Sequence, residues 1–140
     1  MTAFRELALA LRAAGVRWTP RPGDRFTLVD PAFADDVYTI AEMVVELQDA
    51  TDAQVLGFNG TTEWALDSVD FADAVWLPRE DQLRDLLGPM FRRLERTADG
   101  YAVTVHLPGR APEDIPAGSA EDAYALAVLA RLAAADAAAG

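Results

Sequence analysis

The spacing of apolar residues near the start of the chain predicts a helix. Phe4, Leu7 and Leu11 recur at intervals of three or four residues, which places them on one face of an α-helix. Gly15 follows at the point where such a helix would end. We therefore expect an amphipathic helix over residues 1–15, and not a signal peptide, because charged residues interrupt the apolar run.

A second helix is indicated by its start and stop signals. Pro78 stands where a helix can begin, acidic residues follow it in the first turn, and Gly88 closes the segment. Beyond this glycine, Phe91 and Leu94 are again three residues apart, as on one face of a helix. Residues 78–96 are therefore expected to form a helix or a helix pair.

The last helix is expected over residues 119–135. Ser119, with Asp122 three positions later, resembles a capping box, in which the serine side chain accepts a hydrogen bond from the first turn. An apolar stripe at helical spacing follows and predicts the buried face of this helix. The proline-rich residues 108–118 before it are expected to form a loop.

Alternating apolar and polar residues predict strands. Residues 101–107 alternate cleanly, so that one face would be buried while Thr104 and His106 lie on the other. Residues 25–67 are expected to hold the remaining strands. Within them, residues 37–47 fit either a strand or a helix, and we interpret them as a strand because β-branched and aromatic residues are frequent there.

A hairpin is predicted at residues 59–60. The pair Asn59-Gly60 tolerates the positive φ angles that a type I′ turn requires. With a two-residue loop, Val55 would pair with Trp64, and both side chains would share the buried face. Gly57, diagonal to Trp64, would leave room for the indole ring.

Together these elements predict an α+β fold in a single domain, residues 1–140, with an antiparallel sheet of about four strands and helices packed on one face. The opposite face of the sheet would be more exposed. Ile40, Leu56 and Phe58, with Tyr38 beside them, are expected to line it. An exposed apolar face would fit a protein partner or a second copy of the chain.

The composition agrees with this fold class and limits the chemistry and the cellular compartment that can be expected. The 140 residues are 51% hydrophobic and 25% charged, which are ordinary values for a globular domain. There is no cysteine, so disulfides, thiolate nucleophiles and cysteine-ligated zinc are excluded. All 12 basic residues are arginine, which is typical of a GC-rich genome. No apolar run reaches the length of a membrane span, and a cytoplasmic protein is expected.

The net charge of −11 is spread over the whole chain. A negative surface repels phosphate backbones, which disfavours nucleic-acid binding. The same charge keeps a protein soluble, and it can steer a basic protein or a cationic ligand towards the surface. We expect neither a nucleic acid nor a membrane among the partners.

Motifs for catalysis are absent from the sequence. His106 is the one histidine, which excludes a Ser-His-Asp triad and a two-histidine metal site within one chain. There is no glycine-rich phosphate loop, and the chain lacks the lysine of a P-loop. Two carboxylate pairs, Glu42 with Glu46 and Glu80 or Asp81 with Asp85, have no converging partners, so neither a metal nor a cofactor is expected.

A group of polar and aromatic residues beside the predicted hairpin is the best candidate for a ligand-binding site. It consists of Thr61, Glu63, Trp64, Asp67 and Arg79. Such a set could bind a small molecule, because a few polar groups beside an aromatic surface are typical of ligand pockets. The alternative is that these residues serve the fold, with Trp64 in the core and Arg79 at the entry to a helix.

The sequence also resembles a protein family. The segments GFNGTTEWALDSV and AVWLPREDQLRDLLG, the strand that begins at Tyr101 and the final SAEDAYALAVLARL are similar to a family of small uncharacterised proteins from GC-rich bacteria. Members of this family are sometimes labelled as pilus assembly proteins, a name otherwise carried by a ParA-like ATPase. Because the chain has no Walker motif, the resemblance implies no ATPase activity, and it implies no catalytic residues.

Two functions of different class are therefore expected. The first is a non-catalytic interaction or accessory protein, and a homodimer is one form that the interaction could take. The second is a small-molecule-binding protein or an enzyme that uses the polar residues beside the hairpin. The missing catalytic motifs favour the first.

Overall fold

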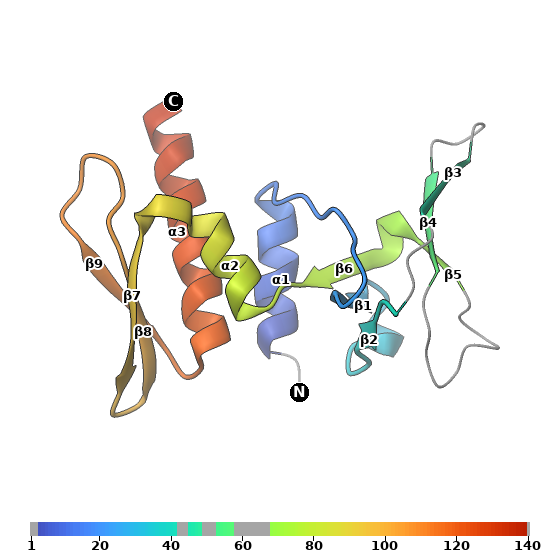
Figure 1. Ribbon diagram of the computed structural model, residues 1–140, viewed down its shortest axis with the longest axis horizontal. Helices are drawn as coiled ribbons and strands as arrows, with labels where there is room; N and C mark the ends of the chain where they lie inside the picture. The colour runs from blue at the N-terminus through green and yellow to red at the C-terminus, as the bar shows by residue number, and fades with distance from the viewer. Residues whose placement is uncertain (1–2, 42–44, 49–52, 58–67, 140) are drawn as a thin grey trace. The chain divides into compact units, whose positions relative to one another are not determined.

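A computed structural model of the chain describes residues 3–41, 45–48, 53–57 and 68–139 (Figure 1). Within these residues the helices are α1 (Ala3–Ala13), α2 (Glu80–Leu87) and α3 (Ala120–Ala139). The strands are β1 (Arg25–Leu28), β2 (Tyr38–Thr39), β3 (Val45–Gln48), β4 (Ala53–Gly57), β5 (Ser68–Asp70), β6 (Ala74–Leu77), β7 (Phe91–Thr97), β8 (Gly100–Val105) and β9 (Glu113–Ala117). Helices and antiparallel strands are both present, and the predicted α+β class is confirmed.

The strands are distributed over several sheets. Where one sheet of about four strands was expected, the described strands form three sheets of three strands each. By its contacts the chain divides into two compact units. The first consists of Met1–Ala8 with Arg17–Pro78, and the second of Leu9–Val16 with Arg79–Gly140. Helix α1 therefore contributes its first half to one unit and its second half to the other.

The first unit contains two of the sheets, with the strand orders β2-β1-β6 and β3-β4-β5. In the first of them β1 is the central strand, since Phe26 pairs with Tyr38 on one side and with Trp76 on the other. The stretch 37–47, which fitted a strand or a helix, holds β2 and the start of β3. Strand rather than helix is thus the conformation of residues 38–39 and 45–47, but they belong to two strands of different sheets and not to one strand.

Aromatic side chains build the core of this first sheet. Phe26 is fully buried, and its ring lies between those of Trp18 and Tyr38, at centroid distances of 5.8 and 5.4 Å. Trp18 also stacks on Trp76, with ring planes 3° apart and centroids separated by 6.3 Å. Trp18 comes from the proline-rich connection after α1, so aromatic packing holds an irregular segment against the sheet.

The prediction of an exposed apolar sheet face is wrong for Ile40. This residue is 1% exposed, because it belongs to the buried cluster around Phe26. Tyr38 is half-buried against the same cluster. The side chain of Leu56 and the whole of Phe58 lie outside the described residues.

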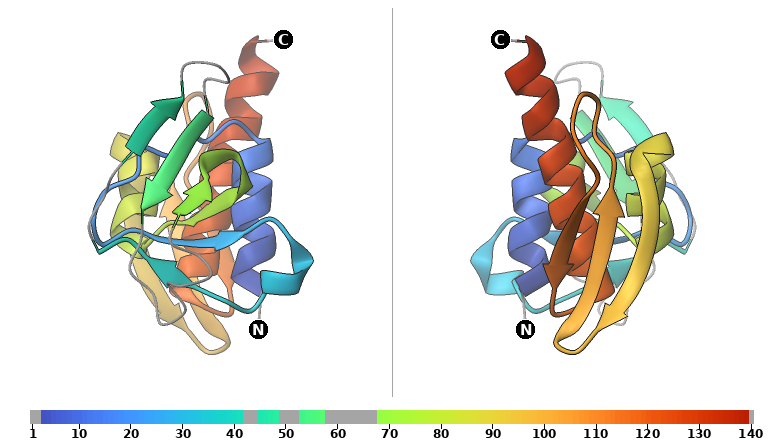
Figure 2. Two further views of the ribbon diagram at one scale, coloured as in Figure 1. Left: turned by 90° about the vertical axis from the view of Figure 1, so that its right-hand side faces the viewer. Right: turned by 90° about the vertical axis from the view of Figure 1, so that its left-hand side faces the viewer.

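The second unit contains one antiparallel sheet in the order β7-β8-β9, with α3 packed across one face (Figure 2). Val103, Val105 and Leu107 are buried and His106 is exposed, as predicted for residues 101–107, but Thr104, expected on the exposed side, is buried. The buried residues of α3 that complete this core are Ala123, Tyr124, Ala127 and Val128. Helix α2 packs beside α3 and buries Leu83 and Leu87.

The ends of the helices follow the signals in the sequence. Gly88 ends α2 with a φ of 58°, a conformation that favours glycine. At the start of α3 the backbone N–H of Asp122 donates a hydrogen bond to Ser119 Oγ at 3.1 Å, as in the serine half of a capping box. The helices expected over 1–15 and 119–135 are both confirmed.

The second half of the predicted helix pair over 78–96 is wrong. Residues after α2 form a short 3-10 turn, Gly88–Met90, and then strand β7. A β-bulge between Phe91 and Arg93 inserts one extra residue into this strand. Phe91 and Leu94 therefore lie on the same face of the sheet although they are three residues apart, which imitates helical spacing.

Part of the segment 108–118, which was expected to be a loop, forms strand β9. Pro116 lies within it, and a proline cannot donate a hydrogen bond to a neighbouring strand. The residue is tolerated because β9 is an edge strand of its sheet.

The predicted hairpin register is also wrong. Val55, expected to pair with Trp64, pairs with Asp70, and Gly57 pairs with Ser68. The partner of β4 is thus β5, which begins beyond residue 67. An Asn-Gly pair favours a tight turn locally, but the pairing of the flanking strands is decided by all their contacts. Residues 59–60 themselves lie outside the described residues.

The turn between β7 and β8 generates a prediction about Gly100, whose φ is 154°. A Cβ atom at this position would run into the carbonyl oxygen of Ala117 and lie 2.8 Å from Gly118 Cα. We expect Gly100→Ala to lower the free energy of unfolding by about 1–3 kcal/mol, as overpacking does. Urea unfolding followed by circular dichroism measures the change.

Gly118→Ala is the matched control. A Cβ atom at Gly118 would have nothing within 4 Å, so this substitution should change the free energy of unfolding by less than about 0.5 kcal/mol. Equal losses in the two variants would contradict the close approach of Gly100 to β9.

Candidate functional site

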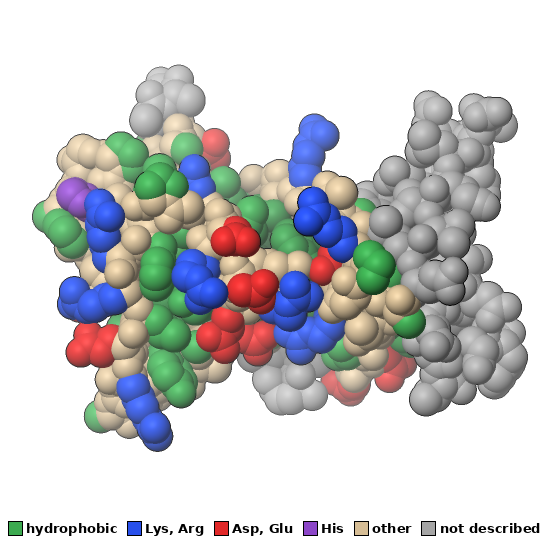
Figure 3. Space-filling view, in the orientation of Figure 1, with side chains coloured by type: hydrophobic (Ala, Val, Ile, Leu, Met, Phe, Trp, Pro, Cys, Tyr) green, Lys and Arg blue, Asp and Glu red, His purple; other side chains and the backbone are tan. Residues whose placement is uncertain are grey.

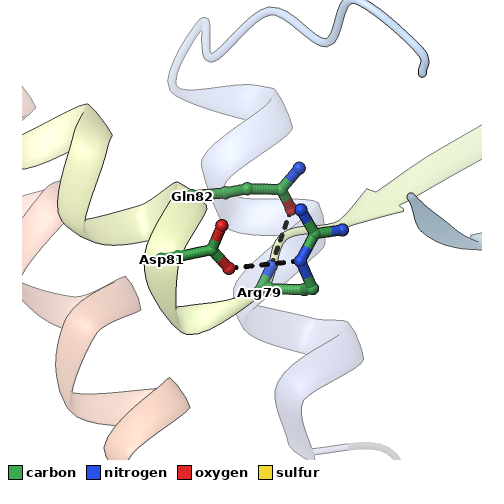
Figure 4. A network of polar contacts seen from close by, with 3 residues as sticks. All are labelled: Arg79, Asp81 and Gln82. Atoms are coloured by element: carbon green, nitrogen blue, oxygen red, sulfur yellow. Dashed lines mark hydrogen bonds and ion pairs between the residues drawn. The ribbon is translucent and has the colours of Figure 1, made fainter. Parts of the chain in front are cut away.

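Arg79, one of the five predicted site residues, lies at the N-terminus of α2 (Figure 4). Its backbone N–H donates a hydrogen bond to Gln82 Oε1 at 2.9 Å, and its Nε donates one to Asp81 Oδ1 at 3.1 Å. The hydrogen bond from the guanidinium lowers the pKa of the Asp81 carboxyl below its usual value. These contacts agree with the alternative interpretation of Arg79, in which it serves the entry to a helix.

The other four predicted site residues, Thr61, Glu63, Trp64 and Asp67, lie outside the described residues. The site beside the hairpin therefore stays a prediction. Arg79 gives it no direct support, because its guanidinium is engaged with Asp81.

A second group of polar side chains lies in the second unit, on the sheet face opposite α3. Side chains alternate across a strand, so Thr104 points away from the buried side of β8. The register places Arg93 on one side of Thr104 and Asp114 on the other, in a row across the three strands. Thr104 Oγ1 donates a hydrogen bond to Asp114 Oδ1, and Arg93 Nη2 lies 3.9 Å from the same oxygen.

Neighbouring residues extend this row. Along β7, Arg93 Nε lies 3.5 Å from Glu95 Oε1. At the bulge, Arg92 Nη2 lies 3.4 Å from His106 Nδ1, and Figure 3 shows arginine side chains beside the single histidine. We call the residues Arg92, Arg93, Glu95, Thr104, His106 and Asp114 the outer face.

The outer face differs from the core in exposure and in charge. All its side chains except that of Thr104 are exposed, and Thr104 is 4% exposed because Arg93 and Asp114 flank it. Ion pairs between exposed side chains contribute little to stability, so these charges are available to other partners. The acidic and basic side chains of the outer face can bind a charged surface, but they form no catalytic arrangement.

Most of the outer face was not predicted from the sequence. Thr104 and His106 were expected on the exposed side of a strand, and His106 is exposed whereas Thr104 is buried. Arg93 and Asp114 were assigned to a helix and to a loop, so their approach to Thr104 could not be foreseen. The available signal was the charged run around position 93, because charged side chains are also typical of an edge strand.

A buried acidic residue, Asp24, contacts the aromatic core of the first unit. Asp24 is 2% exposed, and its Oδ2 accepts hydrogen bonds from the Trp18 indole N–H at 2.9 Å and from the Arg21 backbone N–H at 3.1 Å. A buried carboxylate is costly unless hydrogen bonds satisfy it. These bonds make Asp24 a structural residue that holds Trp18 against the sheet.

Among residues 3–41, 45–48, 53–57 and 68–139, no three histidine, aspartate or glutamate side chains gather in a way that could hold a metal ion. In the same ranges no helix is both long enough and apolar enough to cross a bilayer.

No protein-family model matches the chain, and no match was found among the curated proteins or the solved structures. The resemblance to the family of small proteins from GC-rich bacteria therefore stays a prediction.

The hydrogen bonds of Asp24 predict the effect of its removal. Asp24→Ala leaves the indole N–H of Trp18 and the N–H of Arg21 without this acceptor, which should lower the free energy of unfolding by about 1–3 kcal/mol. Urea unfolding followed by tryptophan fluorescence measures the loss. Asp136→Ala, an exposed position on α3, is the control and should change stability by less than about 0.5 kcal/mol. Equal effects of the two substitutions would contradict the structural role of Asp24.

The contact between Arg79 and Asp81 predicts a pH effect. A lowered pKa means that the favourable contact is present above the usual pKa of the carboxyl and is lost as pH falls through the lowered value. An NMR titration of the Asp81 side chain should give a pKa below the usual one in the native chain. In Arg79→Ala this pKa should rise towards the usual value, and an unchanged titration would show that Arg79 is not its cause.

Proposed function

We propose that the chain is a non-catalytic, cytoplasmic protein-interaction or accessory protein that binds its partner through the outer face and the adjoining edge of β7. The observation that carries this proposal is the row Arg93, Thr104 and Asp114, which presents both charge signs on a regular sheet. Arginine is enriched in protein interfaces, where it forms hydrogen bonds and packs its apolar stem. A homodimer is one form of such an interaction.

The geometry of the row supports binding rather than structural use. Arg93 and Glu95 are both 59% exposed, and their contact of 3.5 Å is an exposed ion pair. Such a pair stabilises a fold by at most about 1 kcal/mol, so exchanging it for a contact with a partner costs little. The sheet beneath is held by the buried side chains of Val103 and Val105, which gives the surface charges fixed positions.

The alternative function is a small-molecule-binding protein or an enzyme with its site beside residues 59–67. It stays a prediction, since the residues it requires lie outside the described part of the chain. A thermal-shift screen with metabolites and metal ions tests it, because a bound ligand raises the melting temperature.

Site-specific photo-crosslinking tests the proposed interaction. A photo-reactive amino acid in place of Arg92, on the outer face, should crosslink the chain to one partner protein in cells of the organism that encodes it. The same probe in place of Asp136, exposed on α3, is the control and should not crosslink to that partner. Mass spectrometry should identify the same polypeptide in repeated experiments, and unmodified chain should compete with its capture.

Equal labelling by the two probes, or labelling that unmodified chain does not reduce, would overturn the proposed role of the outer face. A crosslinked species that contains only this chain is set apart by mass spectrometry and reports on self-association alone.

A further inference from the structure

The edge of β7 is the feature of this chain that could pair with another strand. In the order β7-β8-β9, β7 is paired on one side within the described residues (Figure 2). Backbone N–H and C=O groups on the other side of an edge strand are a template for a further strand. At seven residues, β7 is also the longest of the described strands.

The order of charges along β7 limits which strand can add to it. The strand reads FRRLERT, so Arg93 and Glu95 flank Leu94. Consider a second copy of the chain that pairs through its own β7, antiparallel to the first, with a two-fold axis at Leu94. Arg93 of each copy then lies opposite Glu95 of the other, and symmetry makes this contact twice. Opposite charges that face each other across a strand pair stabilise the pairing.

In this register, residues that pair between the two copies lie on the same face of the sheet. Arg93 and Glu95 pair with Thr104 and Ala102 in the sheet, so both lie on the outer face. Leu94 lies on the opposite side, where α3 packs, and would meet its own counterpart there. A register shifted by one residue would set outward side chains against inward ones, which a continuous sheet does not permit.

Counting along the strands would set Arg92 opposite Arg96 of the second copy, but the bulge displaces Arg92, so the regular pairing ends at Arg93 and Glu95. Arg92 is the inserted residue, and it turns towards His106 on the exposed side of β8. Arg96 pairs with Tyr101 and shares the side of Leu94. The two guanidinium groups would therefore point to opposite sides of the sheet, where the solvent screens them from each other.

Charged side chains on an edge strand often serve to prevent strand pairing. Residues of a single sign suffice for that purpose, because they repel any copy of themselves. In β7 the two residues that flank Leu94 carry opposite charges, and the side chains of Arg93 and Glu95 are both 59% exposed, free to exchange partners. The order of charges thus favours a second copy over other strands.

We propose that two copies of the chain associate through β7, antiparallel and centred on Leu94, so that their β7-β8-β9 sheets become one continuous sheet. This inference rests on the proposed function, because it names a partner for the edge that adjoins the outer face. It requires no other protein, and for that reason it can be tested on the purified full chain alone.

Charge reversal gives a sharp test of the register. Arg93→Glu places glutamates opposite each other twice, and Glu95→Arg does the same with arginines. Sedimentation equilibrium over a range of concentrations should show a dimer for the native chain, and each single reversal should weaken it by about tenfold or more. The double variant Arg93→Glu with Glu95→Arg restores opposite charges and should return the dissociation constant to within about threefold of the native one.

Arg110→Glu is the matched control. Arg110 lies outside β7, with its Nη1 4.0 Å from Glu113, and its reversal should leave dimerisation unchanged. Circular dichroism of each variant separates loss of pairing from loss of folding, and the recovery of the dimer in the double variant is an outcome that misfolding cannot produce.

A native chain that is monomeric at every concentration would overturn the inference, as would a dimer that neither reversal weakens or that the double variant fails to restore. A monomeric chain that still crosslinks to another protein through position 92 overturns self-association and leaves the proposed function standing. If the chain dimerises but crosslinks to no other protein, binding to a different protein is overturned and self-association stands.

Discussion

The packing of α3 on β8 is the contact on which the second unit depends. Val103 and Val105 are fully buried, and Ala123 and Ala127 of α3 are buried with them. Small side chains on the helix let it lie close to the sheet, and close packing of this kind fixes the position of the strand. Because one face of β8 packs against the helix, the alternation of side chains places Thr104 and His106 on the other face.

The outer face is a consequence of the packing of α3 on β8. Antiparallel pairing on both sides of β8 brings Arg93 and Asp114 level with Thr104, and the three side chains contact one another across the strands. None of these residues is near the others in the sequence. A polar surface is therefore generated by the register of the sheet, which is itself set by apolar contacts on the opposite side.

Signals that act within a few residues were sufficient to predict much of this fold. Gly88 and Ser119 marked helix ends because their roles depend on local backbone geometry. The strand at 101–107 was evident from its period of two. β7 and β9 were not, because the bulge at Arg92 gave β7 a helical spacing and Pro116 is disfavoured in strands that are not at an edge.

Pairing between distant segments accounts for the remaining differences. Val55 pairs with Asp70 rather than with Trp64, and no local signal distinguishes the two registers. The same limit applies to the candidate site. Arg79 could be placed at a helix start from its own neighbours, whereas the outer face required the register of three strands.

The distribution of charge gives the edge of β7 its selectivity. The chain as a whole carries a net charge of −11, yet β7 contains three arginines and one glutamate. Repulsion between acidic molecules opposes random encounters, and salt screens it at separations beyond about one Debye length, roughly 8 Å at physiological ionic strength. At contact distance, the interleaved charges favour only a strand that sets an acid opposite Arg93 and a base opposite Glu95. Repulsion between like-charged molecules excludes most partners. A partner whose charges are complementary to those of β7 at contact distance is retained.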